Sequence, residues 1–305
     1  MKDFQVAATA NTVPIIDARR ATSLLADYVA LTKPRLNFLV VATSAASYYL
    51  GATAALDIIR MMLAVAGTAL VAGGAAVLNQ VSERNTDALM RRTRLRPLPD
   101  GRVTPGEALV LGLLLSATGL TVLATRANLL AASLALGTLV IYLIVYTPMK
   151  RRTPQSTLVG ALPGALPALI GWTASHDYVA AGGAALFAIV FLWQIPHFMA
   201  ISWLYRDDYR KAGFPLLTVI DPGGRRAGRQ AVLFAAALLP VAVVPSLMRV
   251  TGVASGVVAV VLGIALLWLA VAFARTRTDE SARRLFFGSI VYLPILWMAM
   301  IVDKL

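Results

Sequence analysis

Cysteine is absent from the 305 residues, and histidine occurs only twice, as His176 and His197. Without cysteine the chain forms no disulfide, thiolate metal site or cysteine nucleophile. The sequence also lacks a Gly-rich phosphate loop, a His-Glu-x-x-His zinc motif and the Gly-x-Ser-x-Gly turn of serine hydrolases. These absences argue against nucleotide hydrolysis and against zinc-dependent hydrolysis.

Charged residues are scarce as well, at 14% of the chain, whereas hydrophobic residues make up 58%. The mean hydropathy of +0.73 exceeds what a water-soluble core of this size requires. Apolar runs reach or approach the roughly 20 residues that cross a bilayer. The sequence therefore predicts an all-α, polytopic membrane protein with nine transmembrane helices. We place them near residues 36–56, 58–80, 106–125, 127–147, 157–175, 179–203, 229–249, 252–273 and 285–302.

The 28 Lys and Arg residues are distributed unevenly between the two sides of the predicted spans. With the N-terminus inside, only Arg60, Arg126, Arg249 and Lys304 fall on the outer side. Cytoplasmic loops retain basic residues, so we expect a multi-pass protein of the cell (inner) membrane with a cytoplasmic N-terminus and an external C-terminus. The net charge of +13 follows from this topology and does not indicate nucleic-acid binding.

We expect residues 1–30 to form a cytoplasmic N-terminal tail and residues 31–305 to form a single transmembrane domain. The beginning of the chain lacks the charged start and compact apolar run of a cleavable signal. We therefore expect the first span to be retained.

Oxygen-bearing side chains recur every four residues where the second predicted span ends, at Asn79, Glu83 and Asp87. On a helix such positions lie within about 80° of one another and form one stripe. Carboxylates followed by arginines suit a Mg²⁺-bound diphosphate, because the metal takes oxygen ligands and the guanidiniums take other phosphate oxygens. The alternative is a helix end in water, with its acids paired to Arg84 and Arg91. Asn79 argues against that alternative, because an amide at the end of an apolar run needs a partner.

A second candidate segment runs from Trp193 to Gly213. His197 and Asp208 are eleven residues apart, about three helical turns, so they share one face if the helix continues, and Tyr205 lies near that face. An alternative stays open for each residue. For His197 it is a neutral imidazole bonded to a neighbouring helix, and for Asp208 it is a salt-bridged loop acid.

A third candidate is the short turn Tyr146–Thr153, which contains the three consecutive cations Lys150, Arg151 and Arg152. Taken alone, such a turn is typical of a topology determinant. Because two acidic segments are predicted on the same membrane side, the turn also suits a second diphosphate clamp.

Several motifs together resemble one family of membrane enzymes. The Asn-x3-Glu-x3-Asp stripe is followed by Met-x-Arg-Thr-x2-Arg-Pro. The other motifs are Leu-Thr-Lys-Pro-Arg35, Tyr146-Thr-x2-Lys-Arg-x-Thr, Pro-x-Leu-Ile-Gly-Trp172, Trp193-Gln-x-Pro-His-Phe and Tyr-x2-Asp-Tyr-x3-Gly213. From about Leu31 to the final span, the chain is similar to the UbiA-type intramembrane prenyltransferases, and most similar to the branch that farnesylates haem. It departs from the family pattern at Glu83, where Asp is common, and at Ser156, where Asn is common.

The resemblance implies a nine-helix bundle around a central cavity, with the active-site loops on the cytoplasmic side. It implies transfer of a farnesyl group from farnesyl diphosphate to a vinyl group of haem B, giving haem O for haem A and cytochrome oxidase biogenesis. Haem B would be a substrate and Mg²⁺ the cofactor. The expected partners are the lipid bilayer and haem A synthase or other oxidase-assembly proteins, with no nucleic acid.

The expected site residues fall into three groups. By position, the family's catalytic and Mg²⁺-binding residues are Asn79, Glu83, Asp87 and Asp208. We expect the diphosphate to be bound by Arg92, Arg96, Lys150 and Arg151, and the porphyrin to be contacted by His197 and Tyr205.

Two other functions remain open from the sequence. A sister intramembrane prenyltransferase would use the same diphosphate chemistry on an aromatic quinone precursor or a chlorin. A secondary transporter would carry its ion site at acids deep within the spans. None of the 15 acidic residues lies in the middle of a predicted span, which favours an enzyme.

Overall fold

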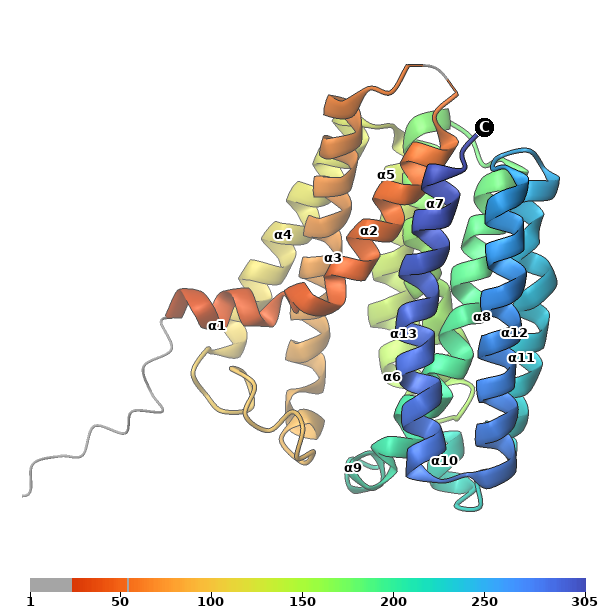
Figure 1. Ribbon diagram of the computed structural model, residues 1–305. Helices are drawn as coiled ribbons and strands as arrows, with labels where there is room; N and C mark the ends of the chain where they lie inside the picture. The colour runs from red at the N-terminus through yellow and green to blue at the C-terminus, as the bar shows by residue number, and fades with distance from the viewer. Residues whose placement is uncertain (1–23, 54) are drawn as a thin grey trace, which may run out of the picture.

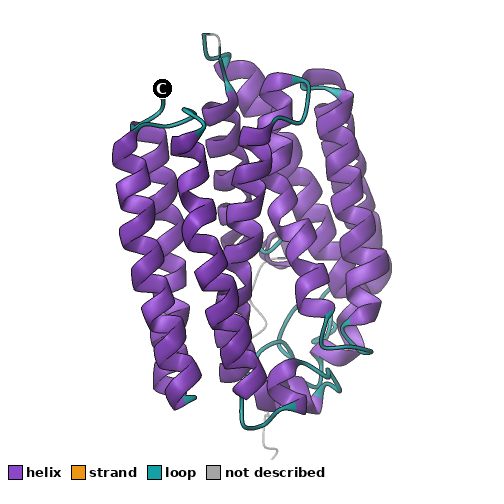
Figure 2. Cartoon of the chain, turned by 90° about the vertical axis from the view of Figure 1, so that its right-hand side faces the viewer, coloured by secondary structure: helices purple, strands orange, loops and turns teal. Residues whose placement is uncertain are grey.

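The computed structural model describes residues 24–53 and 55–305. Within these residues, nine long helices lie side by side in a bundle (Figures 1 and 2), and each overlaps one predicted span. They are α2 (Pro34–Gly51), α3 (Ile58–Asp87), α4 (Pro105–Arg126), α5 (Leu129–Val140) with its continuation through the π-helical segment η2 (Ile141–Tyr146) and α6 (Thr147–Met149), α7 (Ser156–His176), α8 (Ala181–Leu204), α11 (Arg225–Leu247), α12 (Val253–Thr276) and α13 (Asp279–Val302). The short helices are α1 (Leu24–Leu31), α9 (Arg206–Lys211) and α10 (Leu217–Ile220).

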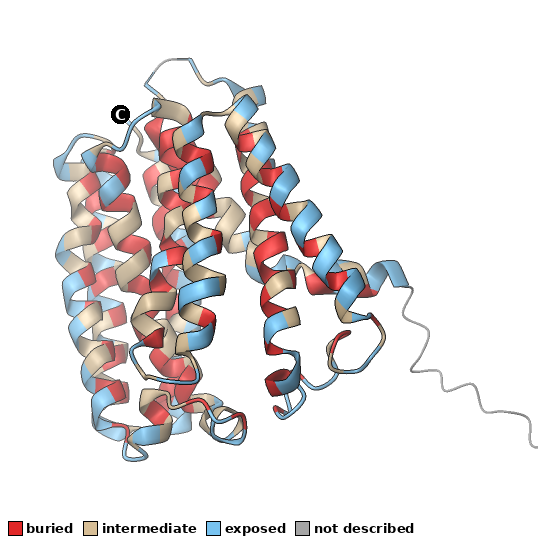
Figure 3. Ribbon diagram, turned by 180° about the vertical axis from the view of Figure 1, so that it is seen from behind, coloured by how far each residue is buried: buried red, intermediate tan, exposed pale blue. Residues whose placement is uncertain are grey.

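The outer faces of the long helices are apolar, which identifies the bilayer as their solvent. On α12, the exposed residues Val257, Val261, Ile264 and Trp268 follow helical spacing. Small residues such as Ala259 and Gly263 lie on its buried face. Figure 3 shows buried residues facing the bundle interior and exposed residues facing outward. Within the described residues, eight helices are long and apolar enough to cross a membrane.

Helix α2 is the ninth long helix of the described residues, and it lacks an 18-residue stretch as apolar as those in the other eight. Its Thr43, Ser44 and Ser47 are buried. Helices α2 and α7 approach closely, because a Cβ added at Gly171 would lie 2.0 Å from the carbonyl oxygen of Ser44. Small residues permit this approach between membrane helices. Buried polar residues of α2 therefore lie where this helix packs against its neighbours in the bundle.

Gly171→Ala is expected to destabilise the bundle by about 1–3 kcal/mol, because the new methyl group would force the backbones of α2 and α7 apart. Gly137→Ala on α5 is the matched control, since a Cβ there meets no atom within 4 Å. Thermal unfolding in detergent should show a lower Tm for Gly171→Ala only. An unchanged Tm would show that α2 and α7 can move apart without loss of stability, which contradicts the prediction.

The loops that carry the candidate site lie at one end of the bundle. Figure 1 shows the α3–α4 loop and the segment with α9 and α10 at the end opposite the C-terminus. A capping box at Thr104 and Glu107, with Pro105 in the first turn, ends the first of these loops and starts α4. Of the predicted tail, residues 1–23 lie outside the described residues. From Leu24 the chain forms α1, and the single N–H of Arg102 Nε is shared between the two carboxylate oxygens of Asp27 in this helix, each at 3.1 Å.

Candidate active site

A cavity of ≈ 440 Å³ lies inside the bundle, and α2, α3, η2, α7 and α8 contribute to its lining. One part of the lining is charged and contains the stripe on α3. Another part is formed by side chains of α8, including Gln194, His197 and Phe198. Within the described residues, the lining carries four cationic side chains (Lys33, Arg92, Arg96 and Lys150) and two carboxylates (Glu83 and Asp87), so its formal charge is positive.

The predicted stripe is present on a single helix, because α3 continues to Asp87. Asn79, Glu83 and Asp87 all line the cavity. Their exposed fractions are only 2%, 7% and 2%. The alternative of a helix end in water is therefore wrong.

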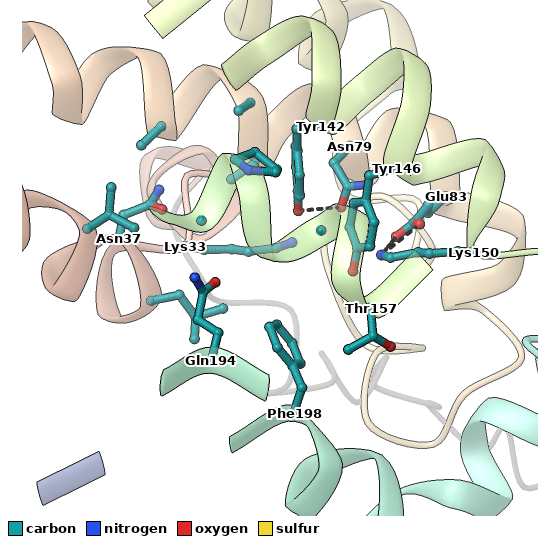
Figure 4. A pocket seen from close by; sticks show the side chains of 18 of the residues that line it. Lys33, Asn37, Asn79, Glu83, Tyr142, Tyr146, Lys150, Thr157, Gln194 and Phe198 are labelled. Carbon is teal, nitrogen blue, oxygen red and sulfur yellow. Dashed lines mark hydrogen bonds and ion pairs between the residues drawn. The ribbon is translucent and has the colours of Figure 1, made fainter. Parts of the chain in front are cut away.

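Each member of the stripe has a specific partner, and Figure 4 shows partners of Asn79 and Glu83. Lys150 Nζ donates to both carboxylate oxygens of Glu83, at 2.9 and 3.1 Å. Arg96 Nη1 donates to Asp87 Oδ2 at 2.7 Å. The Asn79 amide donates to Thr147 Oγ1 at 3.1 Å and accepts from the Tyr142 hydroxyl at 3.4 Å. Two buried carboxylates are thus compensated by cations from two different loops.

Lys33 also lines the cavity, although no sequence motif assigned it a role there. It lies in the left-handed region (φ 50°, ψ 56°) at the corner between α1 and α2. Its side chain reaches into the cavity toward Tyr142 and Tyr146 (Figure 4). Burial and the positive charges of Arg96 and Lys150 lower the pKa of Lys33 to about 7, and Asp87 and Glu83 offset this only in part. An anion in the cavity would restore the charged form.

Three of the four predicted phosphate ligands, Arg92, Arg96 and Lys150, line the cavity. The fourth predicted ligand, Arg151, is exposed and lies outside the cavity lining of the described residues. Of the three consecutive cations in this turn, Lys150 is thus the one that lines the cavity. Tyr146 and Ser156, which flank this turn, also line the cavity.

Asp208 and Tyr205 lie beside the cavity, in the described chain, and are not part of its lining. The Arg92 backbone N–H donates to Asp208 Oδ2 at 3.4 Å. The Arg92 guanidinium lies 4.8 Å from the centre of the Tyr205 ring. His197 and Asp208 do not share a helix face, because α8 ends at Leu204 and α9 begins at Arg206. The two acidic segments are nevertheless neighbours, joined through Arg92.

The stripe offers hard oxygen donors of the kind that Mg²⁺ prefers. Among residues 24–53 and 55–305, no three acidic, histidine or cysteine side chains converge on one metal position. Both stripe carboxylates are instead engaged by Lys150 and Arg96. A divalent cation would fit this donor set by taking the place of those contacts. The assignment of Asn79, Glu83, Asp87 and Asp208 to the metal stays a prediction.

His197 lines the cavity from α8 and is bonded to a neighbouring helix, as one of its two interpretations predicted. Its Nδ1 lies 2.8 Å from Ser289 Oγ on α13. Its ring stacks against Trp193, at 5.0 Å between centroids, and against Phe286, at 5.2 Å. The imidazole is therefore held in a fixed orientation at the cavity wall.

Comparisons with a family model and with a known protein both relate this chain to prenyltransferases. The model of the UbiA prenyltransferase family matches residues 39–293. A protein of Opitutus terrae (strain DSM 11246 / JCM 15787 / PB90-1) named protoheme IX farnesyltransferase is 44% identical over 296 residues, covering 97% of this chain and 98% of that protein.

Solved structures share the fold. A digeranylgeranylglyceryl phosphate synthase aligns with a TM-score of 0.78 at 16% identity, covering 92% of this chain and 99% of that one. A UbiA homologue from Archaeoglobus fulgidus, bound to GPP and Mg²⁺, aligns with a TM-score of 0.64 at 18% identity, covering 90% and 99%. The family match spans most of the chain and the relative is similar along nearly its whole length. The chain therefore belongs to the UbiA prenyltransferase family and is a membrane prenyltransferase.

Proposed function

We propose that this enzyme transfers a farnesyl group from farnesyl diphosphate to a vinyl group of haem B, giving haem O. The observation that carries the proposal is a single cavity that joins a charged stripe to an apolar wall where the aromatic Phe198 lies beside the fixed imidazole of His197. The charged stripe suits a diphosphate, and this apolar wall suits a flat, apolar acceptor. The similarity to the protoheme IX farnesyltransferase of Opitutus terrae supports this acceptor.

Cationic residues and a metal ion have separate roles toward the diphosphate in this reaction. Lys33, Arg96 and Lys150 bind the diphosphate oxygens and absorb negative charge as the allylic C–O bond breaks. Arg92 adds a further cation to the same part of the cavity lining. Mg²⁺, held by Asn79, Glu83, Asp87 and Asp208, would neutralise the leaving diphosphate. The GPP and Mg²⁺ bound by the Archaeoglobus fulgidus homologue support this role.

The bond changes balance without any redox partner. The electron pair of the C–O bond leaves with the diphosphate, and the π electrons of the haem vinyl group form the new C–C bond. Water then adds to the resulting carbocation and loses a proton, which gives a hydroxyethylfarnesyl substituent. Apolar cavity walls, including Val71, Ile170 and Phe214, keep other water away from the allylic cation.

The direct test uses the purified protein in detergent with haem B, farnesyl diphosphate and Mg²⁺. We expect a porphyrin product with the mass of haem O, and we expect a metal chelator to abolish its formation. Boiled protein is the control. If the protein instead consumed farnesyl diphosphate only with an aromatic quinone precursor or a chlorin, the acceptor assignment would be wrong. If no acceptor led to diphosphate release, the prenyltransferase mechanism itself would be in error.

Farnesyl diphosphate affinity is expected to fall as pH rises above about 7, because Lys33 loses its proton there in the empty cavity. The sign follows from the anion, which favours charged Lys33, so that binding takes up a proton at higher pH. Lys33→Met should weaken binding and flatten this dependence. Arg35→Met is the matched control, since Arg35 is exposed two residues away. Equal pH slopes for wild type and Lys33→Met would contradict the assignment.

We also propose how the bundle is oriented in the membrane and which proteins receive its product. The end of the bundle that carries the candidate site faces the cytoplasm of the cell (inner) membrane, with the N-terminus inside and the C-terminus outside. The distribution of basic residues supports this orientation. The product would pass to haem A synthase or to other oxidase-assembly proteins. A reporter fused to Leu305 that is active only outside the cytoplasm tests the orientation.

A further inference from the structure

The imidazole of His197 is held by a short hydrogen-bonded chain that leads into α13. His197 Nδ1 lies 2.8 Å from Ser289 Oγ, and Ser289 Oγ lies 2.7 Å from the carbonyl oxygen of Phe286. Ser289 is fully buried. Trp193, one turn before His197, donates from its indole N–H to the Ser289 carbonyl oxygen at 2.8 Å. Two side chains of α8 are thus anchored at the same residue of α13.

This chain of contacts fixes which nitrogen of His197 carries the proton. A serine hydroxyl has one hydrogen, and the carbonyl oxygen of Phe286 can only accept. Both short contacts are satisfied together only if Ser289 donates to Phe286 and His197 Nδ1–H donates to Ser289. Neutral His197 then carries its lone pair on Nε2.

Nε2 is left without a hydrogen-bond partner among the described residues, although His197 lines the cavity. A neutral imidazole nitrogen without hydrogen can only accept a hydrogen bond or bind a metal. It therefore offers nothing to a diphosphate oxygen. Mg²⁺ prefers oxygen ligands and is expected at the α3 stripe.

We infer that His197 Nε2 binds the iron of the haem acceptor and that Ser289 is the positioning residue that fixes the imidazole for this bond. The inference rests on the proposed function, because the iron is part of the proposed substrate. Histidine ligands of metals usually donate their other ring N–H to a protein acceptor, which orients the ring and strengthens the donor nitrogen. The stacking of His197 on Trp193 and Phe286 restricts ring rotation further. Iron ligation would fix the porphyrin plane and thereby place the vinyl group relative to the diphosphate end of the cavity.

The first experiment titrates purified protein with haem B and follows the Soret absorption and the electron paramagnetic resonance spectrum. Wild type should give the spectrum of histidine-ligated haem. His197→Ala should lose that spectrum and bind haem B at least ten-fold more weakly. The same titration with metal-free protoporphyrin IX, followed by fluorescence, separates ligation from packing. Removing iron should weaken binding to wild type and should leave binding to His197→Ala nearly unchanged.

The second experiment keeps His197 and removes its support. Ser289→Ala leaves Nδ1–H without an acceptor, so haem B should bind about ten-fold more weakly. The iron–histidine stretching frequency in resonance Raman spectra of the ferrous complex should fall. Ser116→Ala is the matched control: Ser116 on α4 is also buried and donates to its own helix, to Gly112 O at 2.8 Å. This control should change neither quantity.

If His197→Ala weakened haem B and protoporphyrin IX equally, His197 would serve only as a packing surface and the inference would fail. An unchanged haem spectrum in His197→Ala would overturn it as well. A wild-type protein that makes haem O without a histidine-ligated spectrum would refute the inference and leave the proposed function standing. A wild type that neither binds haem B nor makes haem O would refute the proposed function itself.

Discussion

Asp87→Asn is expected to lower kcat/KM for prenyl transfer by roughly 10²–10³-fold, the scale at which loss of one charge-stabilising group acts on a buried transition state. Asp87 is nearly fully buried, lines the cavity and accepts the hydrogen bond of Arg96. An amide keeps the size of the side chain and removes its charge. The metal would lose a charged ligand, and Arg96 would lose the partner that orients it. Initial rates of haem O formation at several Mg²⁺ concentrations measure this loss.

Asp100→Asn is the control for this variant, because Asp100 lies in the same loop, is exposed and pairs with Arg102. It should keep wild-type activity. Asp208→Asn should also lose activity if Asp208 joins the metal site when substrate binds. Circular dichroism and Tm in detergent must show that each variant is folded. Near-normal haem O production by folded Asp87→Asn would contradict the assignment of Asp87 as a ligand of Mg²⁺.

Lys150→Met is expected to lower activity about 10²-fold or more and also to reduce stability. Lys150 supplies the cation that compensates buried Glu83, at 2.9 Å. Removing it leaves a carboxylate in a mostly apolar bundle without its partner, which costs about 3–5 kcal/mol when the group is fully buried and less here, where Lys150 is partly exposed. Arg152→Met in the same turn is the control, since Arg152 is exposed. Activity and Tm together measure the two effects.

The double variant Glu83→Gln/Lys150→Met separates stability from catalysis. Without either charge the pair needs no compensation, so the Tm should recover toward the wild-type value. Activity should stay low, because both a metal ligand and a phosphate ligand are gone. If activity recovered with the Tm, the pair would be structural, and the diphosphate clamp would have to lie elsewhere in the cavity.

The sequence was sufficient to place the helices and the α3 stripe, because apolar length and four-residue spacing are local properties. The charges on Arg96 and Lys150 were visible too, but their pairing with Asp87 and Glu83 depends on how two loops fold back against α3. The same limit applies to Lys33. The motif Leu-Thr-Lys-Pro-Arg does not indicate where its side chain points, and only the left-handed corner before α2 turns it into the cavity.

The predicted shared face of His197 and Asp208 failed for a related reason. It required an uninterrupted helix, and the backbone of Tyr205 (φ −111°, ψ 21°) separates α8 from α9. Ser289 could not be identified from sequence, since it is 92 residues away from His197 and one of many serines in apolar helices.

The polarity of α2 has a consequence for how the protein is made. Among the long helices of the described residues it is synthesised first, and its buried hydroxyl groups make its transfer into lipid less favourable than that of the helices that follow. Helix α3, with a mean hydropathy of 2.0 over its most apolar stretch, is a much stronger insertion signal. We therefore expect α2 to enter the bilayer stably only after α3 and the arginines behind it have been synthesised, and to complete its packing only when α7 arrives.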